Sequence, residues 1–410
     1  MKIWLCKHSE PIPVDLNSRL YRVGMIADSL RKKKHEVFWW TSDYNHVKKN
    51  RYTNIDILPN GTALIFGRGI EYKKNISFSR IINHTQIGSQ FTRRMNKVEY
   101  PDVIYTTIPT LDYAYRAVKF GKKNSIPVVV DILDLWPDVF LDLIPLDFLK
   151  KDWMFYLSNK KLEFILTNAD YIIGITEEYL MWGLDKINAR FDKDKHKVFP
   201  IGYKREKTNI TSEKKGNKFK IIFAGTIGYH FDLNTVFEAA ALLEEDNIEF
   251  NILGDGDLLE QYREKYLKYS NINFLGWTEG DITTSHLMAS DIGIAPYNNS
   301  KNFILNIPNK PYEYIAYNLP VLTCLKGATK KFLETHDIGY FYEEKNSENL
   351  AEKIIEIKNN KDLLNLKRKN CEITFKNNYN ASTIYDELAE FLEKVSMEDK
   401  STKMKKENLI

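Results

Sequence analysis

The chain has 410 residues, of which 43% are hydrophobic, and its formal net charge is only +4. This length is too great for one ordinary domain and suits two domains of roughly 150–200 residues, each with a full core. The small net charge argues against a protein dedicated to binding nucleic acid.

Cysteine usage and the N-terminus indicate a cytoplasmic protein. Cys6 and Cys324 lie in apolar runs, which is typical of reduced core thiols. The first ten residues lack the apolar core of a signal peptide, and no run approaches the ~20 apolar residues of a membrane span. Lysines occur in short scattered runs, which favours solvated faces over a membrane-binding patch. Any contact with the inner membrane face is therefore expected to be peripheral.

The chain opens as a βαβ unit. Strands are predicted at residues 2–6 and 36–42, and a helix with an apolar stripe at 17–32. The first turn, residues 8–18, contains no glycine. The G-x-G-x-x-G fingerprint of a dinucleotide-binding domain is therefore absent, which disfavours nicotinamide or flavin chemistry.

Residues 51–98 have weak periodicity, and we expect irregular strands there with a mobile loop near 66–79. The alternation of strands and helices then resumes. Further elements of the first half are strands at 102–107, 127–133, 171–176 and 197–201, and a helix at 111–120. The continuous Val and Ile of 127–133 are typical of a sheet covered on both faces.

A polar linker at 202–218 precedes a second alternating set. Its strands are predicted at 219–224, 249–253, 272–276, 292–297 and 320–324, and its helices at 233–243, 258–269, 285–289, 310–317 and 330–335. Such alternation implies parallel sheets with right-handed crossovers. The sequence thus predicts two doubly wound α/β domains, residues 1–201 and 202–380. A last helix at 381–397 precedes a charged tail, 398–410, which we expect to fray.

The segment from Asp291 to Gly327 carries the most chemical information. Two short buried strands flank a polar loop and the helix predicted at 310–317. In an open α/β sheet, ligands bind in the crevice at the carboxyl ends of the strands. A helix N-terminus at that edge suits a phosphate group.

Within this helix, Asn309 is the predicted N-cap and Asn318 the left-handed residue that ends it. Lys310, Glu313 and Tyr317 share a face that need not be buried. Lys310 in the first turn suits a phosphate, and Glu313 could accept hydrogen bonds from sugar hydroxyls. A surface helix with an ordinary Lys and Glu fits the same geometry, so both interpretations stay open.

Residues 308–322, PNKPYEYIAYNLPVL, resemble the donor-site motif of retaining glycosyltransferases of family 4, in the form used by the branch that builds bacterial surface polysaccharides. The resemblance covers roughly residues 1–395. It implies the GT-B fold: two Rossmann-like domains face a cleft, and the last helix crosses back to the first domain. It also implies that Glu313 binds the ribose of a nucleotide-sugar. A second family carboxylate, eight positions earlier, is replaced here by Leu305.

Two glycine turns fit the same donor site. Residues 223–228, FAGTIG, follow a strand, where glycines allow a ligand to approach the backbone. By resemblance this loop lies against the donor diphosphate. The family's usual Arg and Lys are missing there, so the charge would rest on Lys310, helix dipoles and His230, although His230 equally fits a polar surface position.

The turn at 253–257, LGDGD, resembles the family's G-x-G turn beneath the nucleotide, and its position after a strand argues against a D-x-D metal motif. No spacing in the sequence suits a metal site, so we expect neither a metal nor a cofactor. The donor-binding residues that the resemblance implies are Gly225, Thr226, Gly228, His230, Gly254, Gly256, Pro296, Tyr297, Asn309, Lys310, Tyr312 and Glu313.

In the first domain, the turn DILDLWPD at 131–138 matches the D-x-W-P found in this branch and makes Asp134 the candidate for orienting sugar or acceptor. Asp134 could equally cap the turn or pair with an arginine. Arg19 and Arg22 are weaker candidates for binding an acceptor phosphate, and surface charge explains them as well. Residues 140–165 mix aromatic residues with lysines, which favours core packing with snorkelling lysines over membrane contact.

The leading hypothesis is a metal-independent retaining glycosyltransferase with Asp134 and Lys310 as catalytic residues. It would move a sugar from a UDP-linked donor to a lipid-linked or oligosaccharide precursor of a capsule, O-antigen or similar polymer. The leaving phosphate oxygen can itself take the acceptor's proton, which fits the lack of an obvious nucleophile. Two alternatives stay open: a UDP-sugar 2-epimerase of the same fold, and a non-catalytic nucleotide-binding scaffold of a glycosylation complex.

Overall fold

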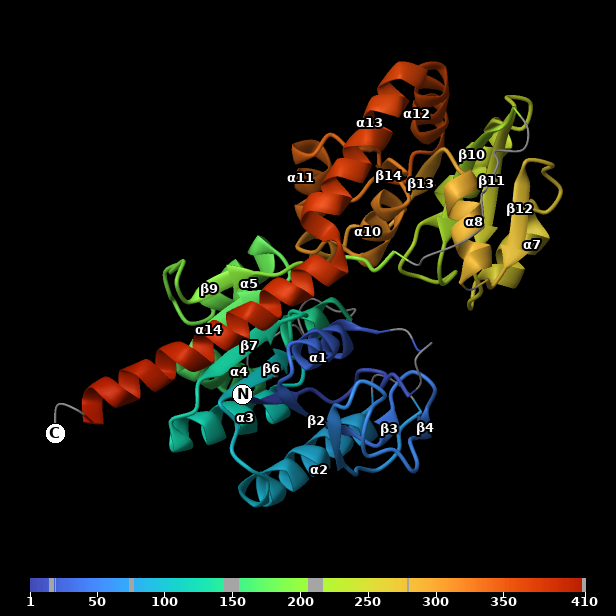
Figure 1. Ribbon diagram of the computed structural model, residues 1–410. Helices are drawn as coiled ribbons and strands as arrows, with labels where there is room; N and C mark the ends of the chain where they lie inside the picture. The colour runs from blue at the N-terminus through green and yellow to red at the C-terminus, as the bar shows by residue number, and fades with distance from the viewer. Residues whose placement is uncertain are drawn as a thin grey trace. The chain divides into compact units, whose positions relative to one another are not determined.

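The computed structural model describes residues 1–14, 18, 20–73, 77–143, 155–205, 217–278 and 280–407 (Figure 1). The chain forms two compact units. Unit 1 comprises Met1–Ile201 and Ser382–Ile410, and unit 2 comprises Gly202–Ala381. Each unit is built on a parallel sheet with helical connections, so the predicted pair of doubly wound α/β folds is confirmed.

Unit 1 has a seven-stranded sheet in the order β5-β2-β1-β6-β7-β8-β9. The strands are β1 (Lys2–Cys6), β2 (Glu36–Ser42), β5 (Ala63–Gly67), β6 (Val103–Ile108), β7 (Val128–Ile132), β8 (Tyr171–Gly174) and β9 (His196–Val198). Every residue of β6 and β7 is buried, as expected for strands with both faces covered. The strand order reverses between β1 and β6.

Helices and a small hairpin complete unit 1. They are α1 (Arg22–Lys32), α2 (Phe78–Arg94), α3 (Leu111–Asn124), α4 (Tyr156–Asn168), α5 (Glu177–Asp185), α14 (Ala381–Glu407), the 3-10 turns η1 (Met95–Lys97) and η2 (Asp138–Leu143), and the antiparallel pair β3 (Tyr44–Asn45) and β4 (Asn50–Arg51).

The prediction for residues 51–98 is wrong in part: strand β5 and a loop at 68–73 are present, but the 17-residue helix α2 was not predicted. Helix α2 exposes Phe78, Ile81 and Ile82 and buries Asn83 and His84. In its first half, apolar residues thus face solvent and polar ones face the core, whereas Ile87 and Phe91 further along are buried. This reversal hides the helical period that sequence analysis relies on.

The last helix, α14, packs on unit 1, as predicted. The Phe391 ring lies 5.5 Å from that of Tyr171 and 5.6 Å from that of Phe199. The helix continues to Glu407, although residues 398–410 were expected to fray. Residues 398–407 contain neither glycine nor proline, and an ion pair of 3.4 Å between Lys394 and Glu398 supports the helix where the fraying was expected to begin.

Unit 2 has a six-stranded sheet in the order β12-β11-β10-β13-β14-β15. The strands are β10 (Phe219–Ala224), β11 (Ile248–Leu253), β12 (Ile272–Gly276), β13 (Ile292–Ile294), β14 (Val321–Thr323) and β15 (Gly339–Phe341). The helices are α6 (Leu233–Leu242), α7 (Leu259–Tyr266), α8 (Asp281–Ala289), α9 (Lys301–Ile304), α10 (Asn309–Ala316), α11 (Ala328–Thr335), α12 (Ser347–Asn359), α13 (Lys361–Thr374) and the π-helical turn η5 (Phe375–Tyr379).

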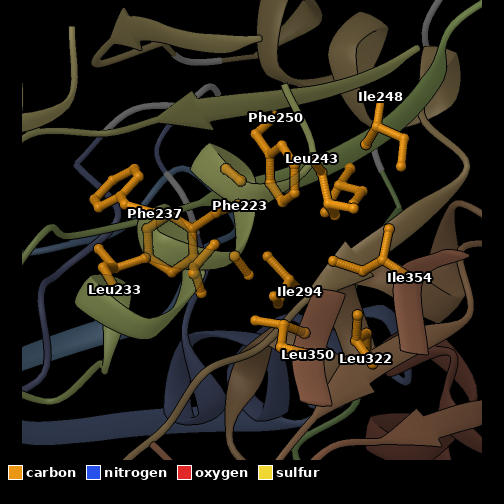
Figure 2. Close-up of a cluster of buried hydrophobic side chains, with 14 of the residues drawn as sticks. Phe223, Leu233, Phe237, Leu243, Ile248, Phe250, Ile294, Leu322, Leu350 and Ile354 are labelled. Carbon is orange, nitrogen blue, oxygen red and sulfur yellow. The ribbon is translucent and has the colours of Figure 1, made fainter. Parts of the chain in front are cut away.

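The core of unit 2 lies between its sheet and the helices α6, α7 and α12 (Figure 2). Phe223 and Phe250 project from neighbouring strands, and Phe237 and Ile354 meet them from α6 and α12; all four are fully buried. Their burial fixes β10, whose carboxyl end carries the first of the two glycine turns.

A buried ion pair joins α1 to the centre of the unit 1 sheet. Arg22 Nε donates to Asp131 Oδ2 at 2.6 Å, and the two side chains are 5% and 0% exposed. Arg22 Nη1 also donates to the carbonyl oxygen of Pro200 at 3.1 Å, and the Tyr105 hydroxyl donates to the same Asp131 oxygen. The start of α1 is thereby anchored through β7.

We expect Arg22→Met to lower the free energy of unfolding by about 3–5 kcal/mol, because Asp131 would remain buried without its cation. Urea unfolding followed by circular dichroism measures the loss. The double variant Arg22→Met, Asp131→Leu should recover most of it, since both charges are then gone. An Arg22→Met protein as stable as the wild type would contradict this role.

Candidate active site

The strand order of unit 2 reverses between β10 and β13, which pair directly. Their crossover helices leave on opposite faces, so a crevice opens at their carboxyl ends. Three predicted donor segments meet there: the loop that follows Ala224, the residues Pro296 and Tyr297 after β13, and the first turn of α10.

Lys310 is the centre of this arrangement. The residue is 6% exposed and lies in the first turn of α10. Its Nζ donates a hydrogen bond to the carbonyl oxygen of Ala224, the last residue of β10. The same atom lies 4.3 Å from the ring centroid of Phe223 and 5.0 Å from that of Phe231. An ammonium group is thus held at the carboxyl end of the central strand.

Burial lowers the pKa of Lys310 to about 8, and the charge of Glu313 acts in the opposite direction. The group is protonated at neutral pH but has lost most of its solvation. A bound anion would restore favourable interactions to it, and would therefore raise the pKa again.

The face of α10 that the sequence did not require to be buried is largely closed, because Lys310 and Tyr317 are both buried. The Lys310 stem crosses two aromatic rings, and Tyr317 packs beside Tyr203 with ring centroids 6.2 Å apart. Only Glu313 on that face is half-buried, and its Oε1 accepts a hydrogen bond of 3.2 Å from the Tyr203 hydroxyl. The Glu313 carboxylate thus already accepts a hydrogen bond from a hydroxyl group.

The ends of α10 differ from the prediction at one terminus. The N-cap is Pro308, so the expectation for Asn309 is wrong; Asn309 is the first helical residue and is exposed. The Lys310 amide donates to the Tyr297 hydroxyl, which does part of the work of a cap. Asn318 has φ 59°, as predicted for the left-handed end.

The glycine turns hold each other in place. Gly225 N donates to the carbonyl oxygen of Leu253 at 2.8 Å, and Ile227 N to that of Asp255 at 2.9 Å. A side chain at Gly254 would overlap the carbonyl oxygen of Gly225, and its φ of 151° favours glycine. Gly256 stands in the same relation to Ile227. These two glycines therefore position the 225–228 loop rather than face a ligand.

The remaining predicted donor residues divide into two groups. Thr226 and His230 are exposed near the crevice, and the His230 ring packs on Phe303 of α9 at 5.7 Å. Tyr312 is 1% exposed and packs against the rings of Phe332 and Tyr379, so its placement supports a core role. Leu305, where the family carboxylate would stand, caps α9 and is half-buried.

In unit 1, Asp134 lies two residues beyond β7, at the carboxyl edge of the sheet. Burial raises its pKa, while hydrogen bonds from Leu135 N and Trp136 and the charges of Lys7 and Arg80 oppose the change. Asp134 therefore caps its own turn in a polar cluster. Its predicted place across a cleft from Lys310 stays a prediction.

Sequence reasoning missed the part played by Glu10. This carboxylate is buried, and its Oε1 accepts from Gly24 N in the first turn of α1 at 2.9 Å. It fills the helix N-terminus where a Rossmann domain binds phosphate. Helix α10 has no side-chain cap of this kind. The glycine-free turn before α1 was the only trace of this arrangement in the sequence.

Of the two acceptor candidates, the structure describes only Arg22. Arg22 is turned into the interior onto Asp131, so its placement argues against a contact with an acceptor phosphate. Arg19 lies outside the described residues. Within the part of the chain that the structure describes, no three His, Cys, Asp or Glu side chains are grouped as a metal site requires.

Comparisons with known proteins agree with this geometry. Residues 204–401 match the family of glycosyl transferases group 1. The probable glycosyltransferase WbjE of Pseudomonas aeruginosa is 24% identical over 253 residues, which cover 58% of this chain and 60% of WbjE. The match therefore spans about three-fifths of that relative's length.

Two solved structures share the fold. Anabaena HepE in complex with UDP has a TM-score of 0.62 at 13% identity, covering 96% of this chain and 99% of HepE. WaaG, a glycosyltransferase involved in lipopolysaccharide biosynthesis, has a TM-score of 0.61 at 12% identity, with coverage of 96% and 99%. The predicted GT-B fold is confirmed, and residues 204–401 are similar to the glycosyl transferases group 1 family.

We expect Gly254→Ala to lower the free energy of unfolding by about 1–3 kcal/mol and to displace the 225–228 loop, because the new Cβ meets a backbone carbonyl at a strained φ. Gly228→Ala is the matched control, since its added Cβ makes only an ordinary contact. Thermal unfolding of both variants checks this; equal effects would refute the locking of the two turns.

Lys310→Met should stabilise the ligand-free protein by about 1–3 kcal/mol at pH 7. The folded-state pKa of about 8 lies below the unfolded value of 10.5, so wild-type stability rises between pH 8 and 10.5. The gain of the variant should shrink over that same window. Urea unfolding at pH 7 and pH 9.5 measures the difference.

The control for this experiment is Lys367→Met. Lys367 is also buried, but it forms an ion pair with Asp337. Its loss should destabilise the protein at both pH values. A gain for Lys310→Met that does not change with pH would show that its ammonium is not the destabilising group.

Proposed function

We propose that this chain is a retaining glycosyltransferase of family 4 that transfers a sugar from a UDP-linked donor to a precursor of a bacterial surface polysaccharide. One observation carries the proposal: the Lys310 ammonium stands at the carboxyl end of β10, beside a glycine loop and one turn before Glu313. The UDP in HepE and the lipopolysaccharide role of WaaG support this choice of donor and product.

In the proposed complex, the donor diphosphate takes the place of the Ala224 carbonyl as the partner of Lys310 Nζ. Amides of the 225–228 loop and the N-terminus of α10 face the same charge. Glu313 accepts hydrogen bonds from the ribose hydroxyls, as it now accepts one from Tyr203. Gly254 and Gly256 allow the 225–228 loop to pack closely against the second glycine turn, which positions the loop for the diphosphate.

The proposed reaction needs no side chain as a nucleophile. An acceptor hydroxyl attacks the anomeric carbon on the face from which the diphosphate leaves. The bond from that carbon to the phosphate oxygen breaks, a glycosidic bond forms, and the hydroxyl proton passes to the departing phosphate oxygen. Lys310 stabilises the charge that grows on the leaving group. Asp134 orients the acceptor.

The acceptor, in this proposal, is lipid-linked or an oligosaccharide at the inner face of the cytoplasmic membrane. Among the helices that the structure describes, none is long and apolar enough to cross a membrane. Contact with the bilayer is therefore proposed to be peripheral. No metal or organic cofactor takes part in the proposed reaction.

Turnover of the donor distinguishes the proposed enzyme from a non-catalytic scaffold. The scaffold is the alternative favoured by Leu305, which stands in the place of the family carboxylate. Thermal shift with UDP-, GDP- and ADP-sugars identifies the nucleotide, because a ligand raises apparent stability by mass action. Release of UDP from a UDP-sugar then separates an enzyme from a scaffold. An epimerase would instead convert the donor without releasing UDP.

Glu313→Gln should weaken UDP binding by roughly 10- to 150-fold and raise KM with little change in kcat, because a hydrogen bond to a charged group contributes about 1.5–3 kcal/mol to ground and transition states alike. Lys310→Ala should lower kcat more than it raises KM, since its partner charge grows during the reaction. Calorimetry with UDP and steady-state kinetics separate the two effects.

The matched control is Glu334→Gln, which changes an exposed carboxylate on α11 that pairs with Lys330. It should leave both constants unchanged. If Glu313→Gln binds UDP as tightly as the wild type does, the donor-site assignment is wrong.

A further inference from the structure

Three large apolar side chains stand in solvent on the outer side of α2. Phe78, Ile81 and Ile82 are 86%, 62% and 48% exposed, and their i, i+3, i+4 spacing makes them neighbours on the helix. Soluble proteins rarely leave such a cluster uncovered without a use for it.

Two other segments join this cluster. Asn83 Nδ2 donates to the carbonyl oxygen of Ile70 at 2.6 Å, which places the loop after β5 against α2. Lys49 Nζ lies 4.9 Å from the ring centroid of Tyr72 in that loop, which brings in the tip of the β3–β4 hairpin. Val47 at this tip is 64% exposed. We call residues 47–49, 68–73 and 78–82 together the α2 surface; residues 74–76 lie outside the described residues.

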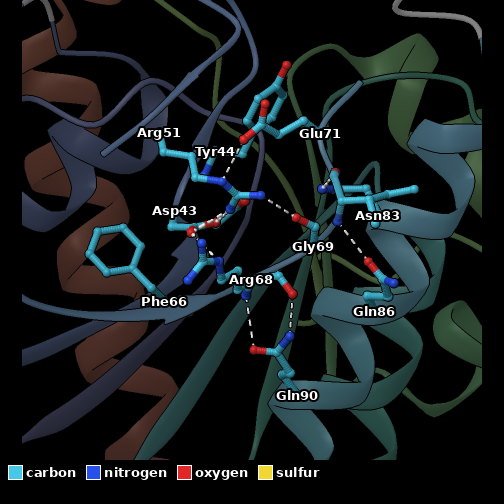
Figure 3. Close-up of polar contacts among 12 residues, drawn as sticks. Asp43, Tyr44, Arg51, Phe66, Arg68, Gly69, Glu71, Asn83, Gln86 and Gln90 are labelled. Carbon is cyan, nitrogen blue, oxygen red and sulfur yellow. Dashed lines mark hydrogen bonds and ion pairs between the residues drawn. The ribbon is translucent and has the colours of Figure 1, made fainter. Parts of the chain in front are cut away.

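The orientation of α2 is fixed by polar contacts on one of its sides (Figure 3). Gln90 accepts from Arg68 N at 3.0 Å and donates to the Arg68 carbonyl, and Gln86 accepts from Ile70 N at 2.8 Å. On the inner side, Ile87 and Phe91 are 0% and 2% exposed. The helix cannot rotate to bury its outer apolar side chains without breaking both sets of contacts.

The 68–73 loop is itself held in place by Arg51 of β4. Arg51 donates to both oxygens of Asp43 at 2.7 and 2.6 Å, to Glu71 at 2.8 Å and to the Gly69 carbonyl at 2.7 Å (Figure 3). The exposed apolar residues are therefore carried on a rigid support, so their exposure is a built feature of unit 1.

Positive charge is concentrated in the same stretch. Residues 47–98 contain ten Lys and Arg residues and two acidic residues, a net charge of +8, whereas the whole chain carries +4. Helix α2 itself has three arginines and no acidic residue. Lys48 and Lys73 are exposed on the α2 surface, and so is Arg68, whose Nε lies 3.8 Å from Asp43 Oδ2. Some of the lysines that are scattered in the sequence therefore lie close together on the α2 surface.

We propose that the α2 surface docks unit 1 on an anionic phospholipid bilayer. Phe78, Ile81 and Ile82 enter the boundary between headgroups and acyl chains, and the surrounding cations meet lipid phosphates. A nucleic acid would meet the same charge but offers no apolar layer for these side chains. The inference deepens the proposed function, since it presents unit 1 to an acceptor held in the membrane.

This surface differs from the membrane contact considered for residues 140–165. Residues 144–154 of that stretch lie outside the described residues. In α4, Leu157 is 76% exposed, but Lys160 pairs with Glu163 at 2.7 Å and Lys161 with Asp112 at 2.9 Å. The α4 cations are therefore largely neutralised, which makes Leu157 a matched control.

Flotation of the full-length protein with vesicles tests the inference. The wild type should float with vesicles containing phosphatidylglycerol, and much less with phosphatidylcholine alone or at high salt. Phe78→Ser combined with Ile81→Ser should reduce the partition coefficient about tenfold or more, because each apolar side chain contributes separately to insertion. Leu157→Ser should float like the wild type. Circular dichroism should be unchanged, since the altered side chains are exposed.

Each other outcome would overturn the proposal. If the wild type does not float, the protein has no such membrane contact. If the double variant floats equally well, or if Leu157→Ser loses binding, the contact lies on another surface. Retention on a nucleic-acid column that depends on Phe78 would indicate a different partner. UDP binding, measured on the same variants, should be unaffected; a protein that floats through Phe78 but binds no UDP would refute the proposed function and leave the docking surface standing.

Discussion

A buried ammonium group at the carboxyl end of β10 is the constraint around which unit 2 is built. Burying a cation is costly unless something compensates it, and Lys310 has a backbone carbonyl and two aromatic faces as its compensation. The Phe223 and Phe231 rings hold the stem, and Gly225 leaves room for the head. The ligand-free protein thus keeps a positive charge poised where a parallel sheet opens.

The two units share one architecture but differ at the N-termini of α1 and α10. In unit 1, Glu10 closes the N-terminus of α1, and Arg22 ties that helix to the sheet. In unit 2, α10 begins without a side-chain cap, next to Lys310. A carboxylate of the protein itself therefore occupies the N-terminus of α1, whereas among the described residues no carboxylate is recorded at that of α10.

Much of the fold could be predicted from the sequence, because buried strands such as 219–224 and 248–253 are largely apolar. The helix at 310–317 was predicted to within one residue, but its burial was not, since the rings that cover Lys310 come from distant segments. Helix α2 was missed because the apolar residues of its first turns, Phe78, Ile81 and Ile82, face outward. The local residue pattern indicates which secondary structure a segment forms. Which side of that helix or strand is buried depends on contacts with segments distant in the sequence.

Unit 2 is an insertion within unit 1, and its two ends are hydrogen-bonded together. Tyr203 N donates to the Tyr379 carbonyl, and Ala381 N to that of Tyr203, both at 3.0 Å. Unit 2 is therefore continuous in sequence and can complete itself during synthesis. Unit 1 cannot, because α14 supplies Phe391 and Tyr385 to its core only after residues 382–407 have left the ribosome. All residues of unit 2 therefore precede α14 in the chain, whereas unit 1 is complete only once this last helix has been made.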